Sequence, residues 1–286
     1  MRHDSFAVKP GERVRISRHH PRGSGGVRSK NHAKALLAKR APQLAELQDM
    51  LHAQGQHGVL VIVQAMDAAG KDSAVRNVFG RVDPHGCNVV SFGKPTDEEL
   101  AHHFLWRHER HLPRRGRIVV FNRSYYEETL AVRVHPELLA RQNLPRAALK
   151  GVWRRRFRDI NAHEAHLVQN GIIVVKFFLN VSREEQRVRF LERMTRRDKN
   201  YKFGAGDLAE RALWGRYMRA YRKMLAATST THAPWYVIPA DRKWHARAIM
   251  ADIVVARLRK LGLCYPALGR EQRRVIRAQR KVLERE

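Results

Sequence analysis

The chain has 286 residues, of which 56 are lysine or arginine and 27 are aspartate or glutamate, so its formal net charge is +29. This charge exceeds what solubility requires and indicates a polyanionic partner, such as nucleic acid, an anionic membrane or inorganic polyphosphate. The sequence lacks the signature of a base-reading helix or of stacking aromatics, an apolar run near the roughly 18 residues of a membrane span, and enough cysteines for a disulfide framework.

The predicted elements alternate along the chain. Residues 1–29 mix prolines and glycines with basic residues, which is typical of an extended arm rather than a packed element. Leucines at helical spacing predict an amphipathic helix over about 31–53, with a kink or break at Pro42. Strands are predicted at 59–63, 88–92, 117–121, 172–179 and 235–238, and helices near 72–79, 97–111, 146–169, 183–195, 206–227 and 242–261. This alternation is typical of a parallel sheet covered on both faces.

The turn that follows the strand at 59–63 predicts a phosphate-binding loop. A buried strand that turns tightly into a helix aims free N–H groups at an anion, and Lys71 adds a full charge. The segment departs from the consensus G-x-x-x-x-G-K-[ST] at Ala65 and Asp72, so an ordinary turn with a solvated lysine is the alternative. The predicted phosphate-binding residues of this loop are Ala68, Ala69, Gly70, Lys71 and Asp72.

Asp67 puts a carboxylate inside the same loop. A carboxylate there repels phosphate unless a divalent cation stands between them. We therefore predict that Asp67 binds Mg²⁺ or orients the waters of the metal. The alternative is a turn or helix N-cap residue, and the two roles are compatible.

The segment Asn122-Arg123-Ser124-Tyr125-Tyr126-Glu127-Glu128 follows the strand at 117–121, at the strand end where ligands bind in such folds. P-loop proteins place an aspartate that holds Mg²⁺ here. Asn122 coordinates through its carbonyl but brings no charge, so Asp67, Glu127 and Glu128 are the candidate anionic groups. Arg123 is the candidate for stabilising the transferring phosphoryl group, with a salt bridge to Glu127 or Glu128 as the alternative.

A basic helix follows the strand at 172–179. Arg189, Arg193 and Arg197 recur every four residues and therefore share one helix face. Together with the basic segment 197–204, they predict a mobile lid, over about 183–215, that folds cations over phosphates. A solvated charged face is the alternative. The charged residues after Gly269 predict a helical tail that contacts another subunit or a polyanion.

A series of motifs occurs in order along the chain: Gln64–Asp72, Val82–Cys87, Lys94–Leu100, Phe121–Glu128, Arg133–Pro136, Lys199–Phe203, His232–Val237 and Pro239–Trp244. Together they resemble the second family of polyphosphate kinases, over roughly residues 6–262. The resemblance implies an α/β P-loop kinase-like three-layer fold, with a parallel sheet flanked by helices and a helical lid. This domain would span residues 30–265, between the arm at 1–29 and a basic helical tail at 266–286.

The resemblance also implies an activity, which is direct in-line and reversible transfer of a terminal phosphoryl group from inorganic polyphosphate to ADP or AMP, with formation of ATP from ADP. Mg²⁺ would be the metal, with Mn²⁺ as a possible substitute, and the protein would be a homo-oligomer, a dimer or a tetramer. The form of the segment Asn122–Glu128 resembles the subgroup that phosphorylates both AMP and ADP. The residues implied are, as catalytic groups, Asp67, Lys71, Arg123, Arg189 and Arg193; as phosphate or nucleotide ligands beside the loop, Asn122, Arg133, Lys199 and Lys202; and as metal ligands, Asp67, Asn122 and Glu127.

Two other functions fit the residues. One is a non-catalytic basic protein that binds polyphosphate or nucleic acid through a degenerate loop, which Ala65 and Asn122 favour. The other is a P-loop kinase that uses ATP to phosphorylate another small acceptor. Two cysteines far apart in sequence predict free thiols, and with no leader or membrane span we expect a cytoplasmic protein without membrane or specific nucleic-acid partners.

Overall fold

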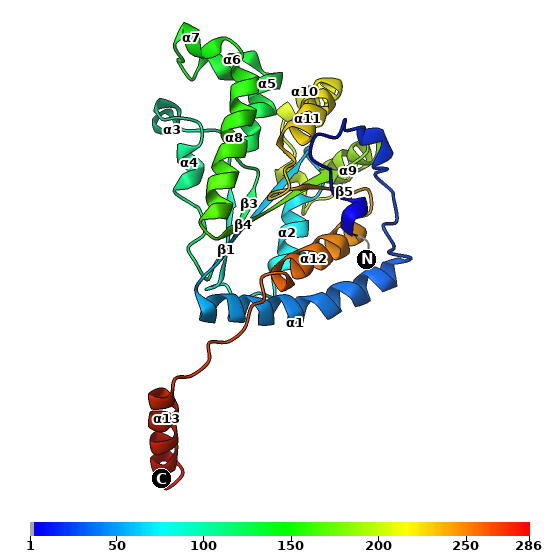
Figure 1. Cartoon of the computed structure of the whole chain (residues 1–286). Helices are drawn as coiled ribbons and strands as arrows, with labels where there is room; N and C mark the ends of the chain where they lie inside the picture. Colours follow the sequence, from blue (N-terminus) through cyan, green and yellow to red (C-terminus); the bar gives the residue numbers. More distant parts are fainter. Residues whose placement is uncertain (1–2) are drawn as a thin grey trace.

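A five-stranded parallel sheet forms the centre of the molecule (Figure 1). The computed structural model describes residues 3–286, so the first two residues of the predicted arm lie outside the described residues. The strands are β1 (Gly58–Ala65), β2 (Cys87–Ser91), β3 (Ile118–Asn122), β4 (Ile172–Asn180) and β5 (Trp235–Pro239), in the order β2-β3-β1-β4-β5. Every residue of the central strand β1 is buried, as its run of apolar residues predicts. All five predicted strands are confirmed.

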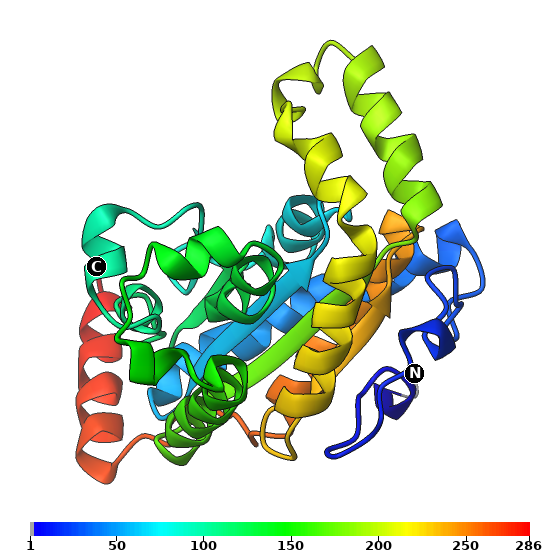
Figure 2. The ribbon, with the colours of Figure 1, turned by 90° about the horizontal axis from the view of Figure 1, so that it is seen from above.

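Helices cover both faces of this sheet, which confirms the predicted three-layer α/β fold (Figures 1 and 2). The longer helices are α1 (Lys30–Gln54), α2 (Lys71–Phe79), α8 (Val152–Gln169), α9 (Arg183–Thr195), α11 (Trp214–Thr228), α12 (Lys243–Arg259) and α13 (Arg270–Leu283). The shorter ones are α3 (Asp97–Ala101), α4 (Trp106–Glu109), α5 (Ala131–Val134), α6 (Pro136–Ala140), α7 (Arg146–Leu149) and α10 (Gly206–Ala212). The 3-10 turns are η1 (His3–Ser5), η2 (Ile16–Arg18), η3 (Tyr125–Thr129) and η4 (Asn200–Lys202). Helices α1, α2 and α12 pack together on one face, and α8 packs with α11 on the other.

Several predicted helices differ in continuity from those observed. Helix α1 continues through Pro42, where a kink or break was expected. The predicted helix at 146–169 is divided between α7 and α8 because Gly151 adopts φ of 70°, a left-handed conformation that ends a helix. The predicted helix at 97–111 is likewise divided, since His102 is extended. These divisions arise from single backbone angles that hydrophobic periodicity does not encode.

The N-terminal arm packs against the domain, contrary to the prediction that it is not a packed element. Its buried apolar residues are Phe6, Val8, Val14 and Val27. The N–H of Val8 donates to the carbonyl of Trp235 (2.9 Å). The N–H of Val237 in turn donates to the carbonyl of Phe6 (2.8 Å), so the arm pairs in antiparallel fashion with β5. Strand β5 is an edge strand with free backbone groups, and the arm satisfies some of them.

Two helical segments project from this body. The hairpin of α9, η4 and α10 rises beyond the edge of the sheet, as expected for a lid (Figure 2). Helix α13 lies within the segment predicted as a helical tail and apart from the rest of the domain (Figure 1). Its apolar residues Val275, Ile276, Val282 and Leu283 are exposed. Within residues 3–286, no helix is both long enough and apolar enough to span a membrane.

Candidate functional site

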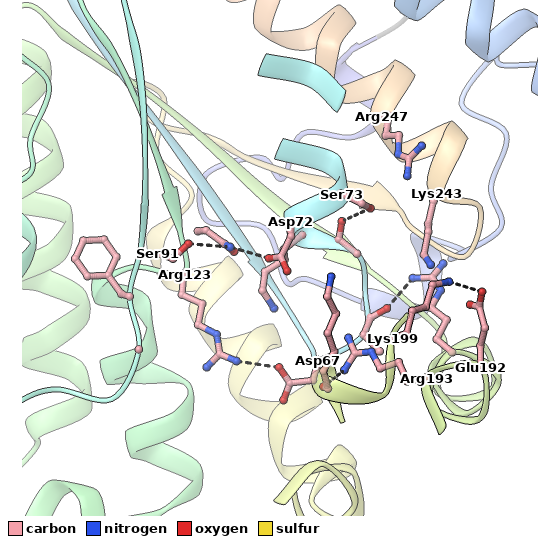
Figure 3. Close-up of a pocket in the computed structure, with 18 residues that line it drawn as sticks. Asp67, Asp72, Ser73, Ser91, Arg123, Glu192, Arg193, Lys199, Lys243 and Arg247 are labelled. Carbon is pink, nitrogen blue, oxygen red and sulfur yellow. Dashed lines mark hydrogen bonds and ion pairs between the residues drawn. The ribbon is translucent and has the colours of Figure 1, made fainter. Parts of the chain in front are cut away.

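A cavity of about 760 Å³ opens at the carboxyl edge of the sheet (Figure 3). Its walls come from the loop between β1 and α2, the end of β3, the lid helix α9 and the first turns of α12. The sequence-predicted residues that line it are Asp67, Ala68, Gly70, Lys71, Asp72, Asn122, Arg123, Arg189, Arg193, Lys199 and Lys202. Three elements distant in sequence therefore bring most of the predicted site together.

The loop between β1 and α2 has the backbone of a phosphate cradle. Gly70 has φ of 102°, where a side chain would be strained, and this turn leads directly into α2 at Lys71. Ala68 also has a positive φ, 59°, without being glycine. Such strain is uncommon and occurs where surrounding contacts hold the backbone in place. The loop therefore needs support from other elements.

The lysine of this loop is folded back beneath it. Lys71 is 9 % exposed, and its Nζ donates to the carbonyl of Ala65 (2.9 Å). Burial lowers the pKa of Lys71, and the nearby Arg123 lowers it further, while the carboxylates of Asp67, Glu127 and Asp72 oppose the shift. An anion that enters the cavity would therefore stabilise the charged form of Lys71.

Asp67 and Arg123 form an ion pair across the cavity, with 2.9 Å between Oδ1 and Nη2 (Figure 3). Arg123 is also 4.0 Å from Glu127, which confirms one of the two salt bridges considered for it. The carboxylate of Glu127 is the main cause of the raised pKa of Arg123. Burial raises the pKa of Glu127 itself. The pair with Asp67 was not expected and joins the two predicted motifs directly.

The end of β3 offers a polar atom with no protein partner. The Nδ2 of Asn122 donates to Asp72 (2.8 Å) and to Ser91 (3.2 Å). Its Oδ1 is buried and has no hydrogen-bond partner among the described residues. Within residues 3–286, no group of three or more His, Cys, Asp or Glu side chains could hold a metal. The unpartnered Oδ1 of Asn122, beside the carboxylate of Asp72, is an oxygen donor of the kind that hard divalent cations such as Mg²⁺ bind.

Arg189 supports the phosphate loop and does not point freely into the cavity. Arg189 as a whole is 4 % exposed. Its Nη1 donates to the carbonyls of Ala68 (3.0 Å) and Ala69 (2.7 Å), and its Nη2 to those of Ala240 (2.7 Å) and Asp241 (3.0 Å). Glu185 pairs with its Nε (2.8 Å). Arg189, predicted to be catalytic, thus holds the strained loop against the end of β5 and is better described as a positioning residue.

This role predicts the effect of Arg189→Lys. The variant retains the charge but cannot serve four carbonyls, so the loop should shift, and we expect kcat to fall by about 10²-fold. The Michaelis constant for polyphosphate should change little, because the charge stays. Steady-state kinetics would measure both values. The control is Arg197→Lys, an exposed position in the turn after α9, which ends at Thr195 and so leaves Arg197 off the helix face predicted for it. A rise in KM at constant kcat would instead indicate direct contact with phosphate.

The lid contributes three further cations. Arg193 lies 3.7 Å from Asp207 and donates to the carbonyl of Lys202 (3.3 Å). Lys199 pairs with Glu192 (2.5 Å). All of these residues except Asp207 line the cavity. Ion pairs between partly exposed side chains contribute little stability, so a polyphosphate chain can displace these carboxylates from the lid cations.

Two cationic residues of the cavity were missed by the sequence analysis. Lys243 and Arg247 lie in the first turns of α12, four residues apart, and both line the cavity. Burial lowers the pKa of each, and Arg189 lowers both further. The Nε of Arg247 is buried without a hydrogen-bond partner among the described residues. Their position just after a predicted strand was an available signal, because strand ends meet at one edge of the sheet.

Two predicted phosphate ligands, Ala69 and Arg133, do not line this cavity. Ala69 is a buried residue of the loop itself, whereas Arg133 lies elsewhere. Its guanidinium lies over the rings of Trp153 (5.4 Å) and Phe157 (6.0 Å). It borders two grooves on the outer side of α11. A role for Arg133 at the phosphate loop is therefore not supported by its location.

The fold and the cavity define an α/β protein of the P-loop kinase class. Residues 27–261 match the family model described as Polyphosphate kinase 2 (PPK2). The chain is 45% identical over 280 residues to an ADP-polyphosphate phosphotransferase of Rhodopseudomonas palustris, with 97% of both chains covered. It is 43% identical over 265 residues to an AMP/ADP-polyphosphate phosphotransferase of Meiothermus ruber, with 91% of this chain and 94% of the relative covered. The crystal structure of Polyphosphate Kinase 2 from Arthrobacter aurescens TC1 superimposes with a TM-score of 0.84 at 39% identity, covering 96% of this chain and 98% of that one. The chain belongs to the polyphosphate kinase 2 family.

Proposed function

We propose that this protein is a polyphosphate-dependent nucleotide kinase, which transfers a terminal phosphoryl group from inorganic polyphosphate to ADP or AMP. The observation that carries the proposal is the cavity itself, in which a phosphate loop faces cations from β3, the lid and α12. The names of the relatives, which are phosphotransferases between polyphosphate and ADP or AMP, support the same reaction. A protein that only binds polyanions does not require a phosphate loop, strand ends and a lid to meet around one cavity.

The two substrates would occupy adjoining spaces. Beside the main cavity lies a more enclosed pocket of about 170 Å³, whose apolar lining includes Phe92, Leu100, Val132 and Leu138. It suits a nucleoside, because bases bind against apolar walls with a few polar groups. Arg123 lines both spaces. We assign polyphosphate to the large basic cavity and the nucleotide to the smaller pocket, so that the phosphoryl group passes beside Arg123.

Catalysis would consist of positioning and charge neutralisation. The attacking group is a phosphate oxygen of the nucleotide, which is a competent nucleophile, so no covalent enzyme intermediate is needed. Lys71 and Arg123 would bind the transferring phosphoryl group and stabilise charge that spreads over its oxygens. Asp67, Asn122 and Glu127 would hold Mg²⁺, which neutralises phosphate charge. Because one phosphoanhydride bond is exchanged for another, the reaction would be reversible.

A direct assay tests this function. Purified protein is given Mg²⁺ and long-chain polyphosphate with ADP or with AMP, and products are separated by chromatography. ATP from ADP would support the proposal, and ADP followed by ATP from AMP would place the enzyme in the group that accepts both. Product formed with ATP as donor and another acceptor, but not with polyphosphate, would contradict it.

The buried position of Lys71 predicts a pH dependence. Because its pKa is lowered, the ammonium group of Lys71 loses its proton at a pH below the usual lysine value of about 10.4. We therefore expect kcat/KM, which reports the free enzyme, to fall with rising pH below that value. The fall in kcat should come at higher pH, because bound phosphate raises the pKa. If kcat and kcat/KM instead fell over the same alkaline pH range, Lys71 would not be the group that titrates.

The proposal extends to assembly and location. We propose a homo-oligomer, a dimer or tetramer, in the cytoplasm. Cys87 and Cys264 are free thiols, which suits a reducing compartment. Light scattering coupled to size-exclusion chromatography would measure the mass in solution, and a monomer would contradict the assembly.

A further inference from the structure

The outer side of α11 carries a second cationic surface, away from the phosphate loop. Three adjoining grooves of about 710, 160 and 920 Å³ form it. Lys223 lines all three, and Arg133 and Arg219 line two each, so the grooves form one continuous surface. We call this surface the α11 groove, defined by Arg13, Arg133, Arg154, Arg219, Arg222 and Lys223.

The charge of the α11 groove is largely uncompensated, because among its lining cations Arg158 alone pairs with a carboxylate, that of Asp159, within the described residues. Among the residues that line it within 3–286, none is aspartate or glutamate, and none of its six defining cations forms an ion pair there. The cavity at the phosphate loop, in contrast, contains Asp67, Asp72 and Glu192 among its cations. A concave surface of one sign with low-dielectric walls concentrates ligands of the opposite charge. The α11 groove therefore favours an anion with many charges.

Local sequence patterns direct these cations outward. Helix α11 buries Ala220, Tyr221, Met224 and Leu225 against the sheet and leaves Arg219, Arg222 and Lys223 exposed. In the arm, Val14 is buried while its neighbours Arg13 and Arg15 are exposed, as extended backbone requires. The arm borders α11 in this way along one groove. Packing of the arm thus completes the cationic surface.

The first turn of α11 connects this surface to the phosphate loop. Arg216 borders the central groove. The next residue, Tyr217, donates a hydrogen bond to Glu210 (2.5 Å). Burial raises the pKa of Tyr217, and so do the carboxylates of Glu210, Glu127 and Asp67. Helix α5 also joins the two sites, because Ala131 and Val132 line the smaller pocket beside Arg123, whereas Arg133 and Val134 line the central groove.

We propose that the α11 groove is a second binding site for inorganic polyphosphate, which holds the distal part of a chain whose end lies at the phosphate loop. The inference rests on the proposed function. A chain held at two places rebinds at the loop with a high effective concentration, and each neutralised phosphate releases counterions. The location of Arg133, a predicted phosphate ligand, is explained if its phosphate is bound here.

Polyphosphate fits this surface better than a nucleic acid. Trp153 and Phe157 are the aromatic side chains that line the α11 groove within the described residues, and both pack against the guanidinium of Arg133. Sequence-tolerant binding of single strands relies on open aromatic faces for base stacking. A polymer without bases needs cations alone.

The test is the dependence of kcat/KM on polyphosphate length. We compare the wild-type protein with Arg219→Ala/Lys223→Ala, and use Lys34→Ala/Lys39→Ala, two exposed positions on α1, as a control with the same charge change. For wild type and control, kcat/KM should rise with chain length and then level off. For the groove variant, values for long chains should fall about tenfold, and the salt dependence should weaken by about 1.4 in logarithmic slope, for two phosphate contacts. Values for the shortest chains, and kcat, should stay the same.

Other results would overturn the proposal. Equal losses for short and long chains would assign both residues to the catalytic cavity. A changed molecular mass of the groove variant would identify the surface as a subunit interface, and tighter binding of single-stranded DNA than of polyphosphate would identify a nucleic-acid site. If the wild type shows no turnover, the proposed function fails separately. Equilibrium binding of long-chain polyphosphate then still tests the groove. If the wild type and the groove variant bind the polymer with equal affinity, the proposal of a second binding site is overturned.

Discussion

Lys71→Ala should lower kcat by roughly 10² to 10³-fold, because preorganised donors at the transferring group supply that much stabilisation of the transition state. The wild-type ammonium lies under the loop, 2.9 Å from the carbonyl of Ala65. The alanine side chain of the variant cannot place a charge at that point. The measurement is initial rates of ATP formation from polyphosphate and ADP. Lys260→Ala, an exposed position just after α12, removes the same charge and should leave the rate unchanged.

Binding of the polymer should survive this change. Long-chain polyphosphate contacts many cations, so the loss of one should weaken affinity by far less than it lowers kcat. Titration with fluorescently labelled polyphosphate would measure the affinity. A protein in which Lys71→Ala leaves turnover intact would contradict the assigned role of the loop. A wild-type protein that binds polyphosphate tightly but never produces ATP would support the alternative of a degenerate, non-catalytic binder.

The fold was predictable because its strands carry long β-branched runs. The loop after β1 and the segment from Asn122 were also recognisable, since each follows a buried strand and the carboxyl ends of parallel strands meet. Periodicity did not reveal single backbone angles, such as that of Gly151, which divide helices. The arm was judged by its glycines and prolines, although the alternation of Phe6, Ala7 and Val8 is the pattern of a strand.

Tertiary partners account for what the sequence could not provide at the site. Arg189 was correctly placed near the phosphate loop, but its role depends on the carbonyls of Ala240 and Asp241, which directly follow β5. The pair of Asp67 with Arg123 likewise links residues of two motifs that periodicity treats separately. In each case the sequence supplies the charged group, and the fold decides which atom it meets.

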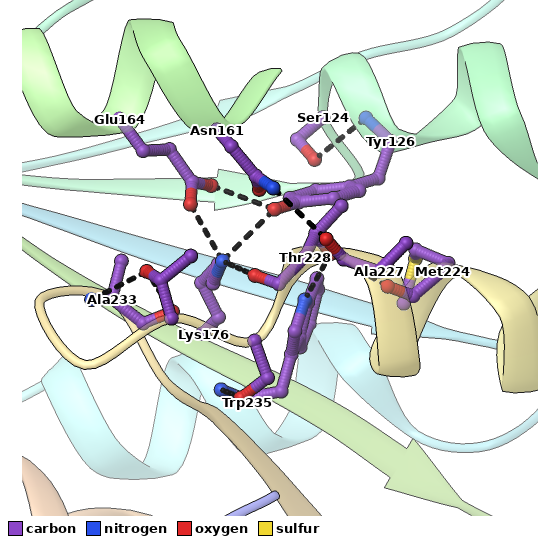
Figure 4. A network of polar contacts seen from close by, with 12 residues as sticks. Ser124, Tyr126, Asn161, Glu164, Lys176, Met224, Ala227, Thr228, Ala233 and Trp235 are labelled. Carbon is purple, nitrogen blue, oxygen red and sulfur yellow. Dashed lines mark hydrogen bonds and ion pairs between the residues drawn. The ribbon is translucent and has the colours of Figure 1, made fainter. Parts of the chain in front are cut away.

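A buried ion pair lies beneath the site, on the α8 and α11 side of the sheet (Figure 4). Lys176 on β4 and Glu164 on α8 are both 0% exposed. The Nζ of Lys176 donates to Glu164 (2.6 Å), to the hydroxyl of Tyr126 (2.9 Å) and to the carbonyl of Thr228 (2.7 Å). The sequence shows that Lys176 is charged and lies within the apolar run of β4, but it does not indicate which residue pairs with it. The network links the segment that carries Arg123 to the end of α11.

Removing one member of this pair should destabilise the protein strongly. Lys176→Met leaves the carboxylate of Glu164 buried without its cation, and we expect a loss of about 3–5 kcal/mol in the free energy of unfolding. Glu164 still accepts hydrogen bonds from Tyr125 (2.9 Å) and Tyr126 (2.7 Å), which keeps the loss within this range. Urea denaturation followed by circular dichroism would measure it.

The double variant Lys176→Met/Glu164→Leu separates charge from packing. A buried ion pair adds little net stability over apolar groups of similar volume, because desolvation offsets its attraction. The double variant should therefore recover much of the stability that the single variant loses. Tyr126 belongs to the segment that presents Arg123, and in the double variant its hydroxyl loses the hydrogen bonds to Glu164 and Lys176. We therefore expect kcat to stay below that of the wild type even in the stable double variant. Full recovery of kcat along with stability would mean that the network holds the fold together but does not position Arg123.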